Sequence, residues 1–193
     1  MRLFKSLNIL AFSTLMIFFS LSCETKDDNP QNISTDTTGQ RLHLLQKIFW
    51  DSLPQPTGYV SDFENIYSDK EKRILDSLIS NFEKRTTIQI ALVTFSENMT
   101  NRENIDTLAF RLLNHWGVGQ KEKNNGIVVG ISKSYKRMRI ENGYGIGKIM
   151  SDTETKTIID SVFIPRFREE KYFEGTLNGL KAIMTNLEKK LQD

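Results

Sequence analysis

The sequence predicts an α/β fold, a three-layer α/β/α sandwich with a mixed sheet of about four strands. Two apolar runs, Thr87–Phe95 and Gly126–Ser132, are typical of buried central strands. Helical patterns alternate with these runs, which implies a sheet covered on both faces. Arg137–Glu141 alternates charged and apolar residues, as a half-buried strand does. The short link between it and Gly126–Ser132 predicts an antiparallel hairpin within the sheet.

The segment before the first of these strands begins with a helical pattern. Arg41–Trp50 has apolar residues at helical spacing, which fits a short amphipathic helix or a segment docked on the domain. Pro54 and Pro56 then end this pattern and favour an extended run.

Longer helices are predicted on both sides of the strands, from apolar stripes with helical spacing. They are expected from Asp69 to about Lys84, from a cap at Asn101 to about Trp116, from Ser151 to a stop at Pro165, and from about Phe173 to Leu191. Two of these begin with a capping box, in which a serine is followed three positions later by a glutamate, at Ser68 and Ser151.

The beginning of the chain has the layout of a secretory signal. Arg2 and Lys5 precede the largely apolar run Leu7–Phe19, which is short for a membrane span. Cys23 follows small and apolar residues, so we predict a bacterial lipoprotein signal whose thiol carries acyl chains such as palmitate. The alternative is an ordinary signal peptide with an incidental cysteine. The predicted organisation is a signal peptide over 1–22, a lipidated Cys23 with a tether and short helix over 23–52, and a folded domain over 53–193.

This organisation predicts a place in the cell. The domain should be anchored by lipid to a membrane of the bacterial cell envelope, on its periplasmic or outer surface. Residues 24–40 are rich in Asp, Asn, Thr, Ser and Gln, which is typical of a flexible tether.

Composition argues against several classes of function. The chain has 26 basic and 24 acidic residues, and Arg2 and Lys5 are the only charges before Cys23, so the mature chain is balanced. This balance gives no reason to expect nucleic-acid binding. One cysteine and two histidines disfavour a zinc site, because these residues are its usual ligands.

Carboxylates and loop glycines remain as candidates for chemistry. Asp62, Glu141 and Asp152 are the candidate metal ligands, because Ca²⁺ and, less well, Mg²⁺ suit oxygen-rich sites. The competing interpretation is that Asp152 only caps a helix and that Asp62 is an ordinary loop acid. Asn125, Gly143 and Gly145 form the candidate ligand loop, although turn chemistry alone also explains these residues.

An ordered set of motifs resembles the TPM domain family and covers about Leu53 to Leu187. The motifs are Pro56–Asp62, Trp116–Gly119, Asn124–Ile127, Arg137–Glu141, Gly143–Gly145, Asp152, Ile164–Phe167, Tyr172 and Gly175.

This resemblance implies an α/β/α domain exported across, or tethered to, a membrane. Family members include a thylakoid-lumen protein linked to photosystem II repair, and acid phosphatase activity or calcium binding has been proposed for some. The family's acidic site corresponds to Asp62 and Asp152, with Glu141 and the Asn124–Asn125 turn as further candidates. The asparagine that usually precedes the first aspartate is Ser61 here.

Two functions follow as expectations. The first is a calcium-binding module that assists the assembly or maintenance of protein complexes in the envelope. The second is a metal-dependent acid phosphatase acting on phosphomonoesters, for which the sequence offers no obvious nucleophile and no assignable catalytic residue.

Overall fold

The computed structural model describes residues 37–192. The predicted signal peptide, Cys23 and tether lie outside these residues. All the described elements belong to one compact unit, Asp36–Asp193.

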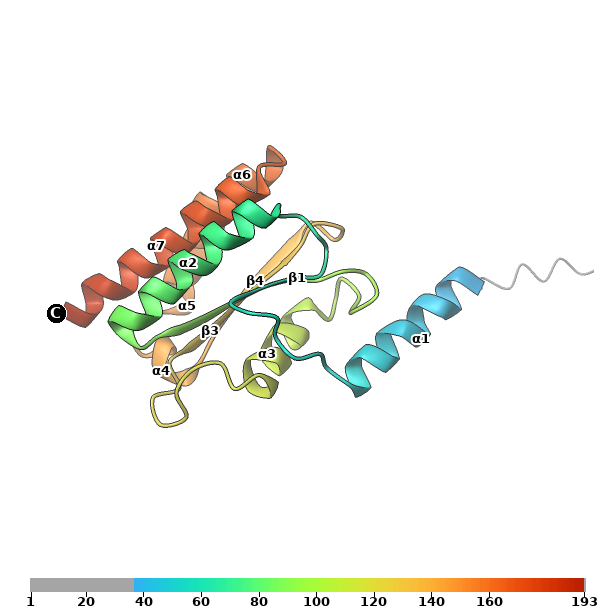
Figure 1. Cartoon of the computed structure of the whole chain (residues 1–193), viewed down its shortest axis with the longest axis horizontal. Helices are drawn as coiled ribbons and strands as arrows, with labels where there is room; N and C mark the ends of the chain where they lie inside the picture. The colour runs from blue at the N-terminus through green and yellow to red at the C-terminus, as the bar shows by residue number, and fades with distance from the viewer. Residues whose placement is uncertain (1–36, 193) are drawn as a thin grey trace, which may run out of the picture. The chain divides into compact units, whose positions relative to one another are not determined.

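A four-stranded mixed sheet lies at the centre of this unit (Figure 1). Its strands are β1 (Val60–Asp62), β2 (Gln89–Thr94), β3 (Gly126–Ser132) and β4 (Arg137–Asn142), in that spatial order. The first three are parallel, and β4 returns antiparallel to β3. The predicted α/β fold with a mixed sheet is therefore confirmed, and the predicted extended run after Pro56 contributes the short strand β1.

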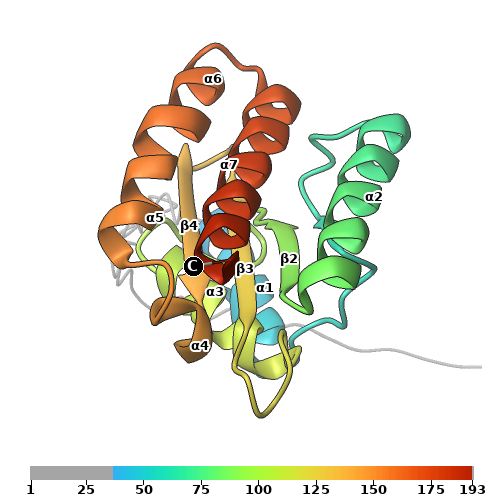
Figure 2. The same ribbon diagram turned by 90° about the vertical axis from the view of Figure 1, so that its left-hand side faces the viewer.

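Two connections carry the chain between the parallel strands. Helix α2 (Asp69–Thr86) joins β1 to β2, and α3 (Ile105–His115) joins β2 to β3. Both connections step in the same direction across the sheet, yet α2 and α3 pack on opposite faces (Figure 2). The two crossovers therefore have opposite handedness, although crossovers between parallel strands are right-handed in about 98% of cases. The carboxyl ends of β1 and β2 lie side by side, and the connections that follow them diverge toward different faces.

The sheet separates two hydrophobic cores. The larger core contains Leu92, Val129 and Ile140 of the sheet together with residues of α2 and of α7 (Tyr172–Gln192). The smaller core lies on the other face, where Val93 and Val128 meet α3. β3 is buried along its whole length because both faces are covered, which explains its continuous apolar sequence.

The helix α2 confirms the prediction made from its capping box. The Ser68 hydroxyl accepts the N–H of Glu71, and the Glu71 carboxylate accepts the N–H of Ser68. The start of α3 differs from expectation: Asn104, not Asn101, is the N-cap residue. The side chain of Asn101 instead accepts the N–H of Asn104 at 3.0 Å, so it closes a turn before the helix.

The helical segment after β4 is longer than expected. It comprises α4 (Tyr144–Gly147), α5 (Asp152–Ile158), a π-helical stretch (Ile159–Phe163) and α6 (Ile164–Arg168). The predicted stop at Pro165 is wrong. The wider π turn ends at Phe163, and Pro165 then lies in the first turn of α6, where a missing N–H is tolerated.

The helix α1 (Thr37–Asp51) packs on the smaller core. Phe49 and Trp50 contact this core, and the Arg111 guanidinium donates to the Trp50 carbonyl at 3.0 Å while lying over its ring. The predicted amphipathic helix and the predicted docked segment are therefore the same element. No helix within residues 37–192 is long and apolar enough to span a membrane.

Candidate functional site

A crevice opens at the carboxyl ends of the parallel strands. Its cavity, of about 560 Å³, is lined by the β1–α2 loop, the β2–α3 loop and the β3–β4 hairpin through Phe63, Glu64, Ile66, Ser96, Glu97, Asn98, Lys133 and Ser134. In open α/β sheets ligands bind where the chain leaves neighbouring strands toward opposite faces. The divergence of α2 and α3 creates such a place here, and two carboxylates line it.

Asp62 is the last residue of β1, next in sequence to Phe63 and Glu64 of the crevice, and it is not one of the residues that line the cavity. Its Oδ1 atom accepts the Thr94 hydroxyl at 2.7 Å and the N–H of Ile66 at 3.1 Å, and its Oδ2 accepts the N–H of Tyr67 at 3.0 Å. Asp62 therefore ties the β1–α2 loop to the end of β2. Both lone pairs of Oδ1 are used in this way, and Oδ2 retains one lone pair for a further ligand.

Glu64 connects the same loop to the β3–β4 hairpin. Its carboxylate accepts the N–H of Lys133 at 2.7 Å, and the N–H and hydroxyl of Ser134 at 3.1 and 2.8 Å. Its own N–H donates to the Thr94 hydroxyl oxygen at 2.9 Å. Hydrogen bonds to an ionised group are stronger than neutral ones, so Glu64 holds the β1–α2 loop, the β3–β4 hairpin and the end of β2 together.

The negative charge of the crevice acts on the surrounding tyrosines. Burial is the main reason that the pKa of Tyr67, Tyr135 and Tyr172 is raised, and the Glu64 carboxylate raises all three further. Glu97 adds to the effect on Tyr135. The ammonium of Lys133, a residue of the same crevice, lies 3.8 Å from Glu170 and 5.3 Å from the centre of the Tyr172 ring.

Glu141 does not belong to this crevice. Glu141 is the register partner of Val128 on β3. Asp62 is the register partner of Thr94 on β2, and Thr94 is in turn the partner of Ile131 on β3. The two acids therefore lie near opposite ends of the strands. They also face opposite sides of the sheet, since Val128 and Ile131 belong to different cores.

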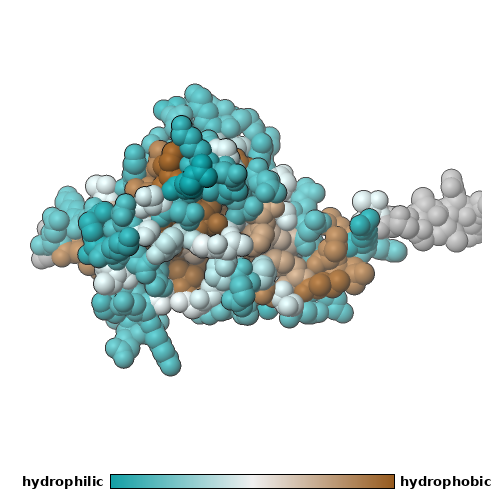
Figure 3. All heavy atoms as spheres, in the orientation of Figure 1, coloured by the Kyte–Doolittle hydropathy of each residue, from teal (hydrophilic) through white to brown (hydrophobic). Residues whose placement is uncertain are grey.

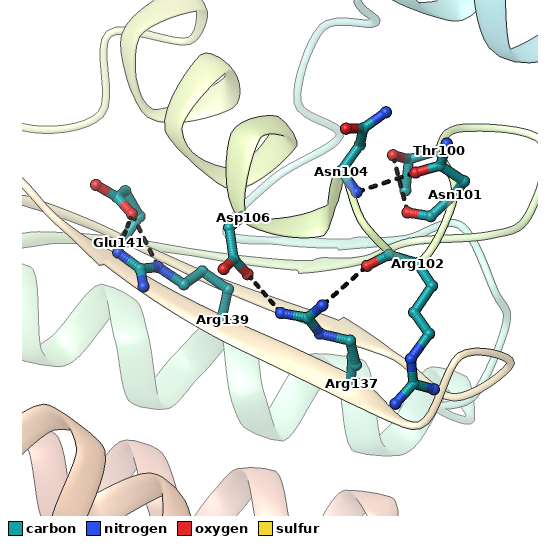
Figure 4. A network of polar contacts seen from close by, with 8 residues as sticks. All are labelled: Thr100, Asn101, Arg102, Asn104, Asp106, Arg137, Arg139 and Glu141. Atoms are coloured by element: carbon teal, nitrogen blue, oxygen red, sulfur yellow. Dashed lines mark hydrogen bonds and ion pairs between the residues drawn. The ribbon is translucent and has the colours of Figure 1, made fainter.

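The partner of Glu141 is a cation on its own strand. Arg139 donates to Glu141 Oε2 from Nε at 3.0 Å and from Nη2 at 2.8 Å (Figure 4). Arg137 of the same face pairs with Asp106 of α3 at 3.2 Å. Both cations on this face of β4 are therefore paired with acids, one on the same strand and one on α3.

Asp152 lies in a third place, in the first turn of α5. The amides of that turn are capped by Ser151 and Glu154, and Asp152 is exposed. The Thr155 hydroxyl of α5 accepts the side-chain amide of Asn142, so α5 begins at the end of β4 that lies away from the crevice. The structure does not bring Asp62, Glu141 and Asp152 together, and no cluster of three or more potential metal-ligating side chains occurs within residues 37–192.

The residues of the predicted ligand loop lie where several backbone segments pack closely against one another. A Cβ atom on Gly145 would lie 2.0 Å from the Lys123 carbonyl oxygen, and one on Gly143 would lie 2.5 Å from the Asn124 carbonyl oxygen. The side chain of Asn125 accepts the N–H of Gln120 at 2.8 Å and donates to the Thr87 carbonyl at 2.7 Å. These residues join three loops at the start of β3, which favours the turn-chemistry interpretation over direct ligand binding.

Glu64, Glu97 and Lys133 were not predicted from the sequence. One signal was present, because Asp62 ends a strand and Glu64 follows it by two residues, at the edge of the sheet. Glu97 follows the next strand in the same way. The carboxyl ends of neighbouring parallel strands meet at one edge, so acids just after two strands are the pattern that points to this crevice.

Comparison with solved structures supports the fold. The chain is similar to the N-terminal domain of a protein from P. gingivalis, with a TM-score of 0.62 and 26% identity over 70% of this chain and 85% of that one. It also resembles the N-terminal domain of a protein from Corynebacterium glutamicum (TM-score 0.52, 13% identity, 67% and 79% covered). A protein from the psychrophilic bacterium Bizionia argentinensis is similar as well (TM-score 0.58, 18% identity, 66% and 86% covered).

Sequence comparison identifies the family. No curated protein matches the chain. The family model described as the TPM domain matches residues 60–186, from the first residue of β1 into α7, which is more than half of the chain. The matched region contains the sheet, both cores and the crevice, and the chain therefore belongs to the TPM domain family.

Proposed function

We propose that this chain is a lipid-anchored, non-enzymatic TPM module of the bacterial cell envelope. Its crevice binds a divalent cation, Ca²⁺ in preference to Mg²⁺, and the module assists the assembly or maintenance of membrane complexes. The single observation that carries this proposal is the position of Glu64 and Glu97 in one crevice at the carboxyl ends of β1 and β2.

The residues of the crevice fit a calcium ion better than a transition metal. Glu64 and Glu97 supply carboxylate oxygens, and Ser96, Asn98 and Ser134 supply hydroxyl and amide oxygens beside them. Ca²⁺ takes six to eight oxygen ligands in flexible geometry, whereas Mg²⁺ requires a stricter octahedron. With only two carboxylates, the expected dissociation constant is on the order of 10⁻⁴ to 10⁻³ M, as in extracellular modules.

The lack of a catalytic constellation among the described residues favours a binding role. Neither histidine in this part of the chain, His43 or His115, hydrogen-bonds a serine hydroxyl or a carboxylate through its side chain. Activated nucleophiles normally have such a base within hydrogen-bond reach. The donors around Glu64 orient a carboxylate of the chain itself and join loops, and none of them activates a nucleophile.

Calorimetric titration of Ca²⁺ into the unit Asp36–Asp193 tests the proposal. This unit contains every described element and both hydrophobic cores. We expect millimolar-range binding that is weakened at least ten-fold in Glu64→Gln and Glu97→Gln. Glu141→Gln is the matched control, because it neutralises a half-buried carboxylate outside the crevice. Equal binding by all four proteins, or none by the wild type, would reject the cation site.

One observation favours the second candidate, a phosphatase. Two N–H groups, of Lys133 and Ser134, and the Ser134 hydroxyl donate to the carboxylate of Glu64. Lys133 also lines the same crevice. If Glu64 turned toward a metal ion, the same donors would suit the oxygens of a phosphomonoester. The metal ion would orient the attacking water. Hydrolysis of p-nitrophenyl phosphate that rises linearly with protein and is lost in Glu64→Gln would support this candidate. Activity that is unchanged in Glu64→Gln and Asp152→Asn would indicate a contaminant.

A further inference from the structure

The outward face of α1 is apolar although the helix is already docked. Leu44, Leu45 and Ile48 are 55%, 38% and 56% exposed. Their spacing places them on one face of α1, whereas Phe49 and Trp50 pack on the smaller core. Figure 3 shows hydrophobic atoms gathered over this helix.

We infer that this face of α1 lies on a lipid bilayer, as an interfacial helix separate from any lipid carried by Cys23. An apolar face flanked by basic residues is characteristic of helices that lie in the plane of a membrane interface. Arg41 and Lys47 are both exposed on α1. Helical spacing places Arg41 at one end of the apolar face, one turn before Leu44 and Leu45, and Lys47 at its side. One exposed acid, Asp51, follows Ile48 by one turn at the other end, so the two cations outnumber it.

The position of α1 in the chain also favours a lipid surface. The segment outside the described residues ends at Thr37, where α1 begins, and it contains the predicted acylation site Cys23. Fully extended, the chain from Cys23 to Thr37 spans at most roughly 50 Å. An acyl chain at Cys23 would therefore keep α1 close to the membrane at all times.

A protein partner fits this surface less well. A specific protein interface uses about 20–30 residues on each side, and the apolar face of α1 offers three large side chains. A second copy of the chain would bury too little area for a stable dimer on this face. A bilayer has no such requirement, because each apolar side chain enters it independently.

Docking through α1 would also orient the crevice. The Gln46 side chain donates to the carbonyls of Glu97 and Thr100 at 2.8 and 3.0 Å. The β2–α3 loop, which carries Glu97, is therefore attached to α1 directly. A helix lying on the membrane would hold this wall of the crevice at a fixed distance from the lipid surface.

Vesicle flotation with the unit Asp36–Asp193, which lacks Cys23, tests the inference. The vesicles contain phosphatidylcholine and phosphatidylglycerol. We expect wild type to float with them, and a triple variant, Leu44→Ser, Leu45→Ser and Ile48→Ser, to bind at least ten-fold more weakly. The control triple variant is Ile74→Ser, Tyr144→Ser and Leu191→Ser, whose side chains are 40–74% exposed on other helices, and it should float like wild type.

Each other outcome overturns the inference. Wild type that stays in the soluble fraction, or an α1 variant that floats equally well, would show that α1 does not hold the domain on lipid. Equal loss in both triple variants would indicate unspecific adhesion. A wild-type dimer in light scattering that becomes monomeric in the α1 variant would assign the face to a second copy. None of the six substituted side chains belongs to either core, so both triple variants should keep the wild-type circular dichroism. Calcium titration reports on the crevice and should also be unchanged in both variants.

Discussion

Asp62 and Thr94 are register partners on β1 and β2, and the Thr94 hydroxyl donates to Asp62 Oδ1 at 2.7 Å. The same hydroxyl oxygen accepts the N–H of Glu64. One fully buried threonine at the end of β2 therefore holds Asp62, the last residue of β1, and Glu64 of the β1–α2 loop in place. The loops that line the crevice are thus attached to the end of the sheet.

Replacing Thr94 by valine should destabilise the domain by about 1–3 kcal/mol, because the N–H of Glu64 loses its acceptor and Asp62 loses a donor. Thr94→Ser keeps the hydroxyl and removes only a methyl group, which costs about 0.8 kcal/mol. Urea unfolding of both variants measures the two values. A Thr94→Val protein as stable as wild type would show that these two hydrogen bonds contribute little.

The junction of loops at the start of β3 should be sensitive to single methyl groups. A Cβ on Gly126 would lie 1.9 Å from the Val118 carbonyl oxygen, whereas one on Gly147 would meet nothing within 4 Å. Gly126→Ala should therefore cost about 3 kcal/mol or more, at the upper end of overpacking effects. Gly147→Ala should be neutral or slightly stabilising, because alanine favours the helical turn of α4. Thermal melts of the two alanine variants give the comparison, and similar melting temperatures would contradict the close packing.

The ion pair between Glu154 and Lys190 predicts an acid-dependent loss of stability. The Lys190 ammonium, 2.6 Å away, lowers the pKa of Glu154 from 4.5 to about 2, and hydrogen bonds from Ser151 add to this. A carboxyl whose pKa is lower in the folded state stabilises the fold above its unfolded pKa. That stabilisation is lost as the pH falls from about 4.5 through 2.

Glu154→Gln removes the titratable carboxyl group of this pair. The free energy of unfolding of the variant should therefore fall less steeply than that of wild type between pH 4.5 and about pH 2. Chemical unfolding at a series of acidic pH values measures both slopes. Glu174→Gln, which neutralises another partly exposed, ion-paired glutamate, is the control for the loss of one negative charge. Identical slopes for wild type and Glu154→Gln would show that the pair is screened by solvent.

Much of the fold could be predicted because local signals and burial agree in its main elements. The capping box at Ser68 predicted the start of α2, and the apolar run Gly126–Ser132 coincides with β3 at both ends. The strand β1 has three residues and no pattern of its own, so only its pairing with β2 defines it. The predicted helix end at Pro165 was wrong because the spacing of apolar residues does not reveal the π turn that precedes it.

The candidate site was harder to predict than the fold. Asp62 was identified, but its expected companions Glu141 and Asp152 lie elsewhere, since sheet register decides which acids meet. That register is set by the pairing of strands that are distant in sequence, and the spacing of residues within one strand does not report it. Glu64 and Glu97 follow strands that are neighbours only in the folded sheet, so their meeting depends on the strand order.

Calcium binding at the crevice is the central claim, and an NMR titration of the unit Asp36–Asp193 with Ca²⁺ tests it most directly. The amides of Lys133 and Ser134 donate to Glu64. If Glu64 turns its oxygens toward a calcium ion, these two hydrogen bonds weaken and their amide signals move upfield together, saturating in the millimolar range. The amide of Gly143, which donates to the Gly126 carbonyl outside the crevice, should stay unchanged. Signals of Lys133 and Ser134 that do not move, or changes confined to the neighbourhood of Glu141 and Asp152, would contradict the proposed site.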